Sequence, residues 1–150
     1  MKNIMLVLAI LVACAVPAKA QYGYPVQTVS DSGTTYTLYN SGNITRSGGW
    51  GFGEQMIDNG TGTQSIAAGG GRLYVLKNNG NVWMYDGSFR MIDNGTGTSQ
   101  MWVDYGTVFI RKNNGQVWRC TNPYAMQWQP ADGGMRNFVR ATQFEKLEAK

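Results

Sequence analysis

The octapeptide Met-Ile-Asp-Asn-Gly-Thr-Gly-Thr occurs twice in this chain without a mismatch, at residues 56–63 and 91–98. The segment Lys-Asn-Asn-Gly-x-Val-Trp recurs with the same offset, at residues 77–83 and 112–118, so the repeat period is 35 residues. A period of this length is typical of propellers, solenoids and arrays, in which one unit cannot bury its apolar face without neighbours. We therefore expect function at positions that recur or in grooves between repeats.

A more divergent copy of the repeat lies upstream. Residues 26–45 align without gaps with residues 64–83, and glycine, aromatic and aliphatic positions coincide. The spacers after each hairpin differ in length, as surface loops do. The sequence thus predicts a single repeat domain over residues 21–142. Its expected parts are repeats at 26–61, 62–96 and 97–134 and a partial fourth at 135–142, followed by a C-terminal tail at 143–150.

The first 20 residues have the order of a secretory signal peptide. Basic Lys2 precedes an uncharged run at residues 3–18, and Ala18-Lys19-Ala20 supplies the small residues of a cleavage site. We expect cleavage after Ala20 and export, so that the protein is secreted, periplasmic or on the cell surface. A competing interpretation remains, because Leu-Val-Ala-Cys at residues 11–14 fits the pattern at which bacterial lipoproteins are cut and acylated, here on Cys14.

The charge and the cysteine content argue against a nucleic-acid-binding protein and against a disulfide-stabilised one. The formal net charge of +4 falls to +2 when Lys2 and Lys19 leave with the leader. The basic residues are scattered singly and form no stripe, so we expect no nucleic-acid partner. Cys120 is the one cysteine outside the leader. It has no disulfide partner in the mature chain, and we expect it to pack as a small apolar residue.

Each repeat is expected to form four short antiparallel strands. Asn79-Gly80 is a strong hairpin signal between two runs rich in β-branched and aromatic residues, and Asn114-Gly115 repeats it. The expected strands of the second repeat are residues 65–68, 72–76, 81–85 and 89–92. Four antiparallel strands per unit is the count of a propeller blade. The sequence therefore predicts an all-β chain of β-propeller blades, three complete and one partial.

The repeat also resembles a known family. An apolar strand, a glycine-rich turn, the hairpin LYVLKNNGNVW at residues 73–83, and an aromatic residue shortly before an Asp and a Gly resemble the tectonin and tachylectin-like β-propeller repeats. The resemblance covers residues 26–142. It implies propeller architecture and, because members are often lectins, a carbohydrate ligand. Such propellers usually have five or six blades, and here this chain departs from the family.

Two expectations follow from the low blade count. Open ends would expose unpaired strand edges, which proteins normally cover or pair. Two chains would close a six-bladed ring, with residues 135–142 supplying a strand across the junction, so we expect a homodimer. The alternative fold is a β-trefoil, which also uses three units of four strands. Gln-Val-Trp at residues 116–118 fits the motif of ricin-type trefoils, although that column holds Asn81 and Asn43 in the other repeats.

The residue types in this chain do not indicate an enzyme. The chain has no histidine, which removes the usual general base and the commonest metal ligand. Asp58, Asp93 and Asp132 recur about once per repeat, and no close pair in sequence suggests the two carboxylates of a glycosidase. A calcium loop also needs more carboxylates than one per copy. We therefore expect no enzyme activity, metal or cofactor.

Two groups of residues remain as candidates for binding sugar. The Asp-Asn-Gly-Thr-Gly-Thr loops offer paired donors and acceptors, although the same residues also form turns in which Asp and Asn cap the backbone. Trp50, Phe52 and Trp128 lie in the variable spacers, where an aromatic face is free to stack on a ring, whereas Trp83 and Trp118 are expected in the core. Arg46 and Arg90 are nearby donors. The candidate carbohydrate-binding residues are Trp50, Asp58, Asn59, Arg90, Asp93, Asn94 and Trp128.

The sequence as a whole predicts an exported, lectin-like repeat protein that recognises glycans on a surface. Each site would be weak, and several sites together would gain strength by avidity. The alternative is a structural or adhesive envelope protein whose propeller surface binds another protein.

Overall fold

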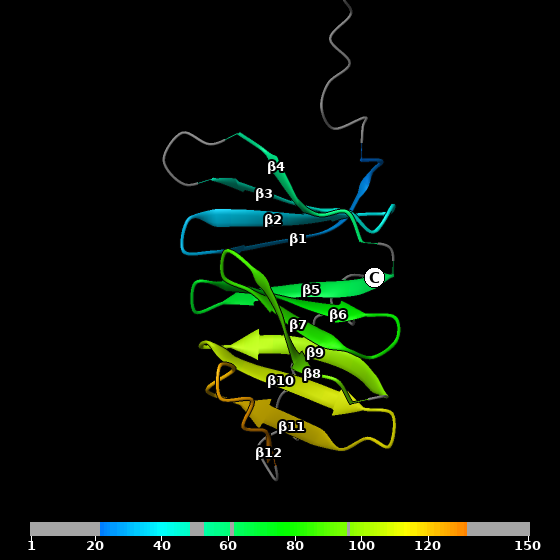
Figure 1. Ribbon diagram of the computed structural model, residues 1–150, viewed down its shortest axis with the longest axis vertical. Helices are drawn as coiled ribbons and strands as arrows, with labels where there is room; N and C mark the ends of the chain where they lie inside the picture. The colour runs from blue at the N-terminus through cyan, green and yellow to red at the C-terminus, as the bar shows by residue number, and fades with distance from the viewer. Residues whose placement is uncertain (1–21, 49–52, 61, 96, 132–150) are drawn as a thin grey trace, which may run out of the picture.

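The computed structural model describes residues 22–48, 53–60, 62–95 and 97–131. These residues form twelve strands in three separate four-stranded antiparallel sheets, which follow one another along the long axis of the molecule (Figure 1). We call the sheets blades 1, 2 and 3. No helix of the length and apolarity needed to cross a membrane occurs in the described ranges.

Each blade is a meander in which consecutive strands pair. Blade 1 consists of β1 (Pro25–Asp31), β2 (Thr34–Tyr39), β3 (Ile44–Gly48) and β4 (Gln55–Asp58). Blade 2 consists of β5 (Thr63–Gly69), β6 (Arg72–Lys77), β7 (Val82–Tyr85) and β8 (Phe89–Asp93). Blade 3 consists of β9 (Thr98–Asp104), β10 (Thr107–Lys112), β11 (Val117–Cys120) and β12 (Gln129–Pro130).

The first strands of the three blades lie next to one another, as the inner strands of a propeller do. The side-chain amide of Gln27 in β1 bonds twice to Ile66 in β5: its Nε2 donates to the carbonyl at 2.7 Å and its Oε1 accepts from the backbone N–H at 2.9 Å. In the same way, Gln64 Nε2 donates to the carbonyl of Ser99 in β9 at 3.0 Å. These bonds tie the first strand of each blade to the first strand of the next.

The hydrophobic core lies between the blades. Strand β6 of the middle blade is covered on both faces, and Leu73, Tyr74, Val75 and Leu76 are all 0% exposed. Leu73 and Val75 pack in the cluster shared with blade 1, and Tyr74 and Leu76 in the cluster shared with blade 3. Two-sided burial explains why this strand reads as an unbroken apolar run in the sequence.

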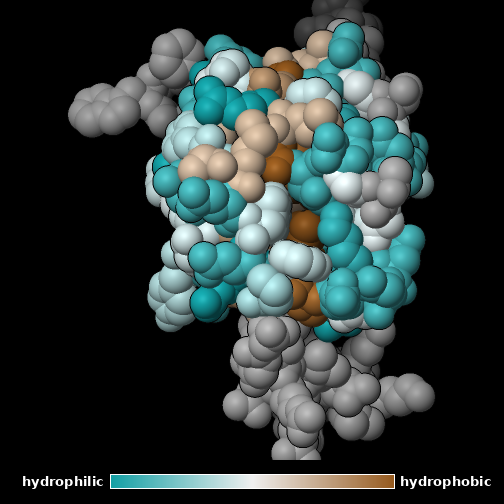
Figure 2. Space-filling model, turned by 60° about the horizontal axis from the view of Figure 1, so that its bottom comes forward, coloured by the Kyte–Doolittle hydropathy of each residue, from teal (hydrophilic) through white to brown (hydrophobic). Residues whose placement is uncertain are grey.

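The two outer blades alternate instead. In β2, Tyr36 and Leu38 are buried against blade 2, while Thr35 and Thr37 on the other face are half-buried. In β10, Val108 and Ile110 are buried, and the opposite face carries Phe109, which stacks on Trp102 with ring centroids 5.4 Å apart. Figure 2 shows that on the face of the molecule in view hydrophobic residues form only a narrow band between hydrophilic flanks, because most apolar side chains lie between the sheets.

The expected dimer and its closing strand are not tested by this single chain. Residues 135–142, which would supply that strand, lie outside the described residues. The homodimer therefore stays a prediction.

The hairpin glycines of blades 2 and 3 provide a direct test of how tightly the blades meet. Gly80 and Gly115 share the same backbone φ of 84°, but a Cβ on Gly80 would lie 3.0 Å from the Gly97 backbone nitrogen, whereas one on Gly115 would meet nothing within 4 Å. Both Ala substitutions should carry the left-handed backbone cost of about 1–2 kcal/mol. Gly80→Ala should lose about 1–3 kcal/mol more through overpacking. Urea unfolding of both variants measures the difference, and equal losses would contradict this close blade contact.

Candidate functional site

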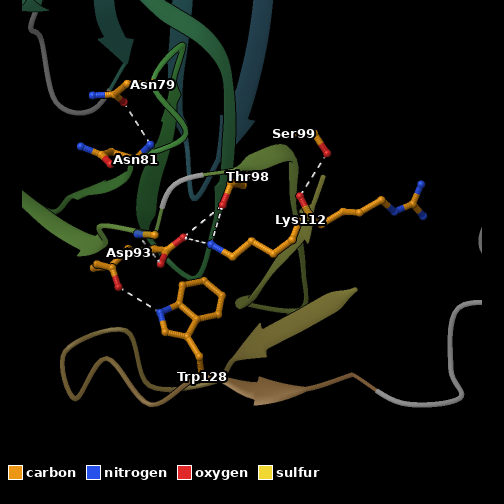
Figure 3. A network of polar contacts seen from close by, with 10 residues as sticks. Asn79, Asn81, Asp93, Thr98, Ser99, Lys112 and Trp128 are labelled. Carbon is orange, nitrogen blue, oxygen red and sulfur yellow. Dashed lines mark hydrogen bonds and ion pairs between the residues drawn. The ribbon is translucent and has the colours of Figure 1, made fainter. Parts of the chain in front are cut away.

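Asp93, one of the expected sugar-binding residues, belongs to a network that joins blades 2 and 3 (Figure 3). Its Oδ1 accepts a hydrogen bond from the Gly95 backbone N–H at 3.0 Å, which closes a turn in its own loop. Its Oδ2 accepts from Lys112 Nζ at 2.6 Å and from Thr98 Oγ1 at 3.1 Å. Lys112 Nζ also donates to Thr98 Oγ1 at 2.9 Å. The last strand of blade 2 is thereby tied to the first two strands of blade 3.

The same network recurs one period earlier, between blades 1 and 2. Asp58 accepts from the Gly60 N–H at 2.7 Å and from Lys77 Nζ at 2.7 Å, and Lys77 also donates to Thr63 at 2.9 Å. We call these two networks the clips. Both oxygens of each aspartate accept hydrogen bonds from the chain itself. Asp58 and Asp93 therefore link neighbouring blades in this structure. The turn chemistry expected for these loops is present, and their role in binding sugar stays a prediction.

Three of the other expected site residues, Asn59, Asn94 and Trp128, lie on or beside the clip loops. Trp128 lies beside the Asp93 loop: its indole N–H donates to the carbonyl of Ile92 at 2.9 Å, and the half-buried ring packs against the core between blades 2 and 3. It thereby anchors the loop between β11 and β12. Trp50 and Phe52 lie outside the described residues. Asn59 and Asn94 are exposed at the tips of the clip loops.

Arg90 lies at the opposite end of β8 from Asp93. Its guanidinium stands 5.3 Å from the ring centroid of Tyr124, and that of Arg72 stands 5.0 Å from the same centroid. The Tyr124 hydroxyl donates to Asp86 at 2.7 Å, and this hydrogen bond lowers the pKa of the Asp86 carboxyl. The structure therefore places Arg90 in a second link between blades 2 and 3 and does not bring it to the Asp93 loop.

Beside the clips, blades 2 and 3 each carry an open hollow at the corresponding position. The blade-2 hollow has a volume of about 380 Å³ and is lined by Gly62, Lys77, Asn78, Asn79, Asn81 and Trp83. The blade-3 hollow has a volume of about 460 Å³ and is lined by Gly95, Gly97, Lys112, Asn113, Asn114, Gln116 and Trp118. Five of the matched pairs are identical, and Gln116 replaces Asn81. These volumes lie near the lower end of the roughly 300–1,000 Å³ that small-molecule sites span.

Local backbone geometry shapes each hollow. The three-residue loop Asn78-Asn79-Gly80 turns back between β6 and β7, with Asn79 Oδ1 accepting from the Asn81 N–H at 3.0 Å. This is the type I turn followed by a left-handed glycine that three-residue hairpin loops favour. Gly62 on the facing side has a φ of 83°, and a Cβ there would lie 3.9 Å from Asn78 Nδ2. Glycine therefore keeps a side chain out of the opening.

The chemistry of the hollows is amide-rich and has no net charge. The Asn78 and Asn113 side chains are exposed, and neither carboxamide makes a hydrogen bond to another residue in the described part of the chain. Each carboxamide supplies donors and an acceptor. Trp83 and Trp118 pack against the core on one side, as expected, and also line the hollows. Each lysine is neutralised by the aspartate of its clip.

The sequence does not single out Asn78 and Asn113, because Asn-Asn-Gly is also the pattern of a hairpin turn. One signal was available. A turn of this type favours Asn or a similar residue directly before the glycine, as at Asn79 and Asn114. It does not need Asn78 or Asn113 one position earlier, and yet this asparagine is repeated.

Cys120 is buried in the core as expected, and burial raises the pKa of its thiol. The described residues contain no group of three or more potential metal ligands.

Charge in the clip is expected to contribute to stability. Asp93→Asn keeps an oxygen for the Gly95 N–H but removes the charge that faces Lys112, and both side chains of the pair are at most 20% exposed. We expect a loss of about 1.5–3 kcal/mol, the range for hydrogen bonds to charged groups. Asp104→Asn, at the exposed end of β9, is the matched control and should change stability by less than about 0.5 kcal/mol. Thermal and urea unfolding of both variants measures this, and equal effects would show that the clip contributes nothing.

Three solved structures identify the architecture, whereas no family model and no curated protein matches the chain. The chain is similar to human WBSCR16, with 14% identity and a TM-score of 0.54, over 65% of this chain and 33% of that one. It is similar to a chain of the YCF48 structure bound to D1 peptide, with 11% identity and a TM-score of 0.54, over 73% and 41%. It is also similar to a chain of a nidogen/laminin complex, with 10% identity and a TM-score of 0.55, over 73% and 48%.

These neighbours are β-propeller proteins, and this chain spans less than half the length of each. At such low identity the likeness concerns the fold alone. Together with the three four-stranded meanders, it confirms the prediction of propeller blades over the β-trefoil.

Proposed function

We propose that this protein is an exported carbohydrate-binding module that holds neutral sugar rings in the blade-2 and blade-3 hollows and performs no catalysis. The observation that carries this proposal is the repetition of the hollow. Five of the six residues that line the blade-2 hollow, all but Asn81, have an identical counterpart 35 residues later in the blade-3 hollow. The repetition places two hollows of like chemistry on one chain, which a ligand with repeated units can engage together.

The residue types support a sugar over other small ligands. A pyranose has an apolar face of C–H groups and a rim of hydroxyls that both donate and accept hydrogen bonds. The exposed part of the tryptophan offers a flat apolar surface for that face, and the carboxamides offer donors and acceptors for the rim. The lysine charge is already neutralised, so the hollows favour a neutral ligand. The resemblance of the repeat to tectonin and tachylectin-like lectins points the same way.

Open hollows of this kind bind weakly one at a time. A surface that displays many copies of one sugar would engage both hollows of a chain, and the second contact is then intramolecular. The expected partner is therefore a polysaccharide or a dense glycan coat.

Matched pairs of asparagine variants test this proposal and the site assignment together. Asn78→Ala with Asn113→Ala removes the two carboxamides of the hollows. Asn59→Ala with Asn94→Ala removes the two at the clip loops. All four side chains are exposed, so both double variants should fold. We expect the first double variant to bind about tenfold or more weakly on a glycan array, because lost hydrogen bonds that cost about 1.4 kcal/mol of binding free energy lower the affinity tenfold. We expect the second double variant to bind like the parent.

The reverse outcome would place the sugar at the clip loops and reject the hollows. A parent protein without signal on the array would overturn the carbohydrate proposal itself.

A second candidate function, protein binding, is favoured by one residue. Tyr105, at the β9–β10 turn, is fully exposed and has a φ of 44°. A left-handed backbone is costly for a tyrosine, and such strain often marks a functional position. Ser32 and Gly70 take the corresponding positive-φ position in blades 1 and 2. This function would be favoured if the parent gave no signal on a glycan array and captured a single protein, and if Tyr105→Gly abolished that capture.

Export is tested by the mass of the exported protein. We expect a chain that begins at Gln21, with or without cyclisation of that residue. Intact-mass spectrometry of the protein recovered outside the cytoplasm measures it. A lipid-bearing chain that begins at Cys14 would instead show the lipoprotein route.

A further inference from the structure

Blade 1 has the same backbone arrangement at the position of the two hollows. The Asn78 N–H donates to the Gly62 carbonyl at 2.7 Å, and the Asn113 N–H donates to the Gly97 carbonyl at 2.7 Å. In blade 1 the Asn40 N–H donates in the same way to Tyr24, at 3.0 Å. Tyr24 therefore stands where blades 2 and 3 have a glycine.

The side chains around this position differ between the blades. Asn40 corresponds to Asn78, but its Oδ1 accepts from the Tyr24 N–H at 3.1 Å. Ser41 corresponds to Asn79, and its hydroxyl donates to the Tyr22 carbonyl at 2.7 Å. Gly23 has a φ of 91°, and a Cβ there would clash with Asn40 Oδ1, so glycine suits this close approach of the chain.

An aromatic ring also occupies the blade-1 position. Tyr22 packs against Tyr39, with ring centroids 5.5 Å apart and planes tilted by 51°. Tyr39 stands in the column of Lys77, and Thr45 in that of Trp83, so Tyr39 is the aromatic surface available in this blade. Its hydroxyl donates to Glu54, and Thr45 donates to the same carboxylate. The Tyr39 ring is therefore a fixed platform.

We infer that blade 1 contains a third sugar-binding site, formed by Tyr39, Asn40 and Ser41, which the segment Tyr22-Gly23-Tyr24 of the same chain occupies. The segment makes two contacts of the kind proposed for the ligand in the other blades, a ring packed against an aromatic ring and a hydrogen bond to the asparagine. The ligand class is the same neutral pyranose. This inference rests on the proposed function.

The occupying segment is held weakly enough to be displaced or removed. Tyr24 is 65% exposed, and Tyr22 is half-buried and belongs to neither core cluster. Ends of a domain that bury little apolar surface open at low free-energy cost. Replacing Tyr22 and Tyr24 with glycine should leave both cores intact and remove the ring contact on Tyr39. The backbone bonds that remain, to Asn40 and Ser41, are exposed to solvent and should exchange for bonds to a ligand.

The test follows the side-chain amide signals of Asn40, Asn78 and Asn113 by NMR. Nitrogen-15-labelled protein is titrated with the methyl glycosides of glucose, galactose and mannose. In the parent, Asn78 and Asn113 should respond and Asn40 should not. In a Tyr22→Gly, Tyr24→Gly double variant, Asn40 should respond as well, and one more glycoside should bind per chain.

Two controls separate the possible outcomes. Tyr105→Gly removes an exposed tyrosine at the β9–β10 turn of blade 3 and should behave like the parent. The Asn78 and Asn113 signals of the double variant are the internal control and should respond as in the parent. An Asn40 signal that stays unchanged while Asn78 and Asn113 respond would overturn the third site and leave the proposed function standing. If the amide signals of all three asparagines stayed unchanged in every protein, the proposed function and the third site would both be overturned.

Discussion

The structure depends on the coverage of both faces of blade 2. A four-stranded sheet whose central strand reads Leu-Tyr-Val-Leu cannot remain open on either side, because each uncovered face would expose fully apolar side chains to water. Blade 1 covers one face through Tyr36 and Leu38, and blade 3 covers the other through Val108 and Ile110. Hydrophobic contact alone does not set the angle or register between sheets. The clips and the glutamine hydrogen bonds between first strands are directional, and they restrict how neighbouring blades are oriented.

The sites follow from the way the blades are joined. A clip needs a loop that brings Asp58 or Asp93 back toward a lysine of the next blade, and a later glycine of that loop, Gly62 or Gly97, borders the hollow. The hollow lies between this glycine and the hairpin of the following blade. Structure and candidate function thus share the same residues, and a substitution in the clip is expected to move the walls of the hollow.

The fold was predictable from the sequence because its signals are local or periodic. The 35-residue period indicated the unit, and Asn79-Gly80 indicated the hairpin between its central strands. The site was only partly predictable. The role of Asp93 depends on Lys112 in the next blade and that of Trp128 on the carbonyl of Ile92, and no pattern within one repeat reveals either partner. Polar residues in turns are ambiguous for the same reason.

The clip has a consequence for how such a protein can change over generations. Every unit of the type seen in blade 2 carries a lysine and a threonine for the unit before it and an aspartate for the unit after it. A duplicated unit is therefore compatible with its parent on both sides from the moment it arises, and the row can lengthen without any new junction. Blade 1 is different, because Tyr39 stands in the lysine column and binds Glu54 instead. A copy of such a unit placed after another blade would have no lysine for the aspartate of that blade.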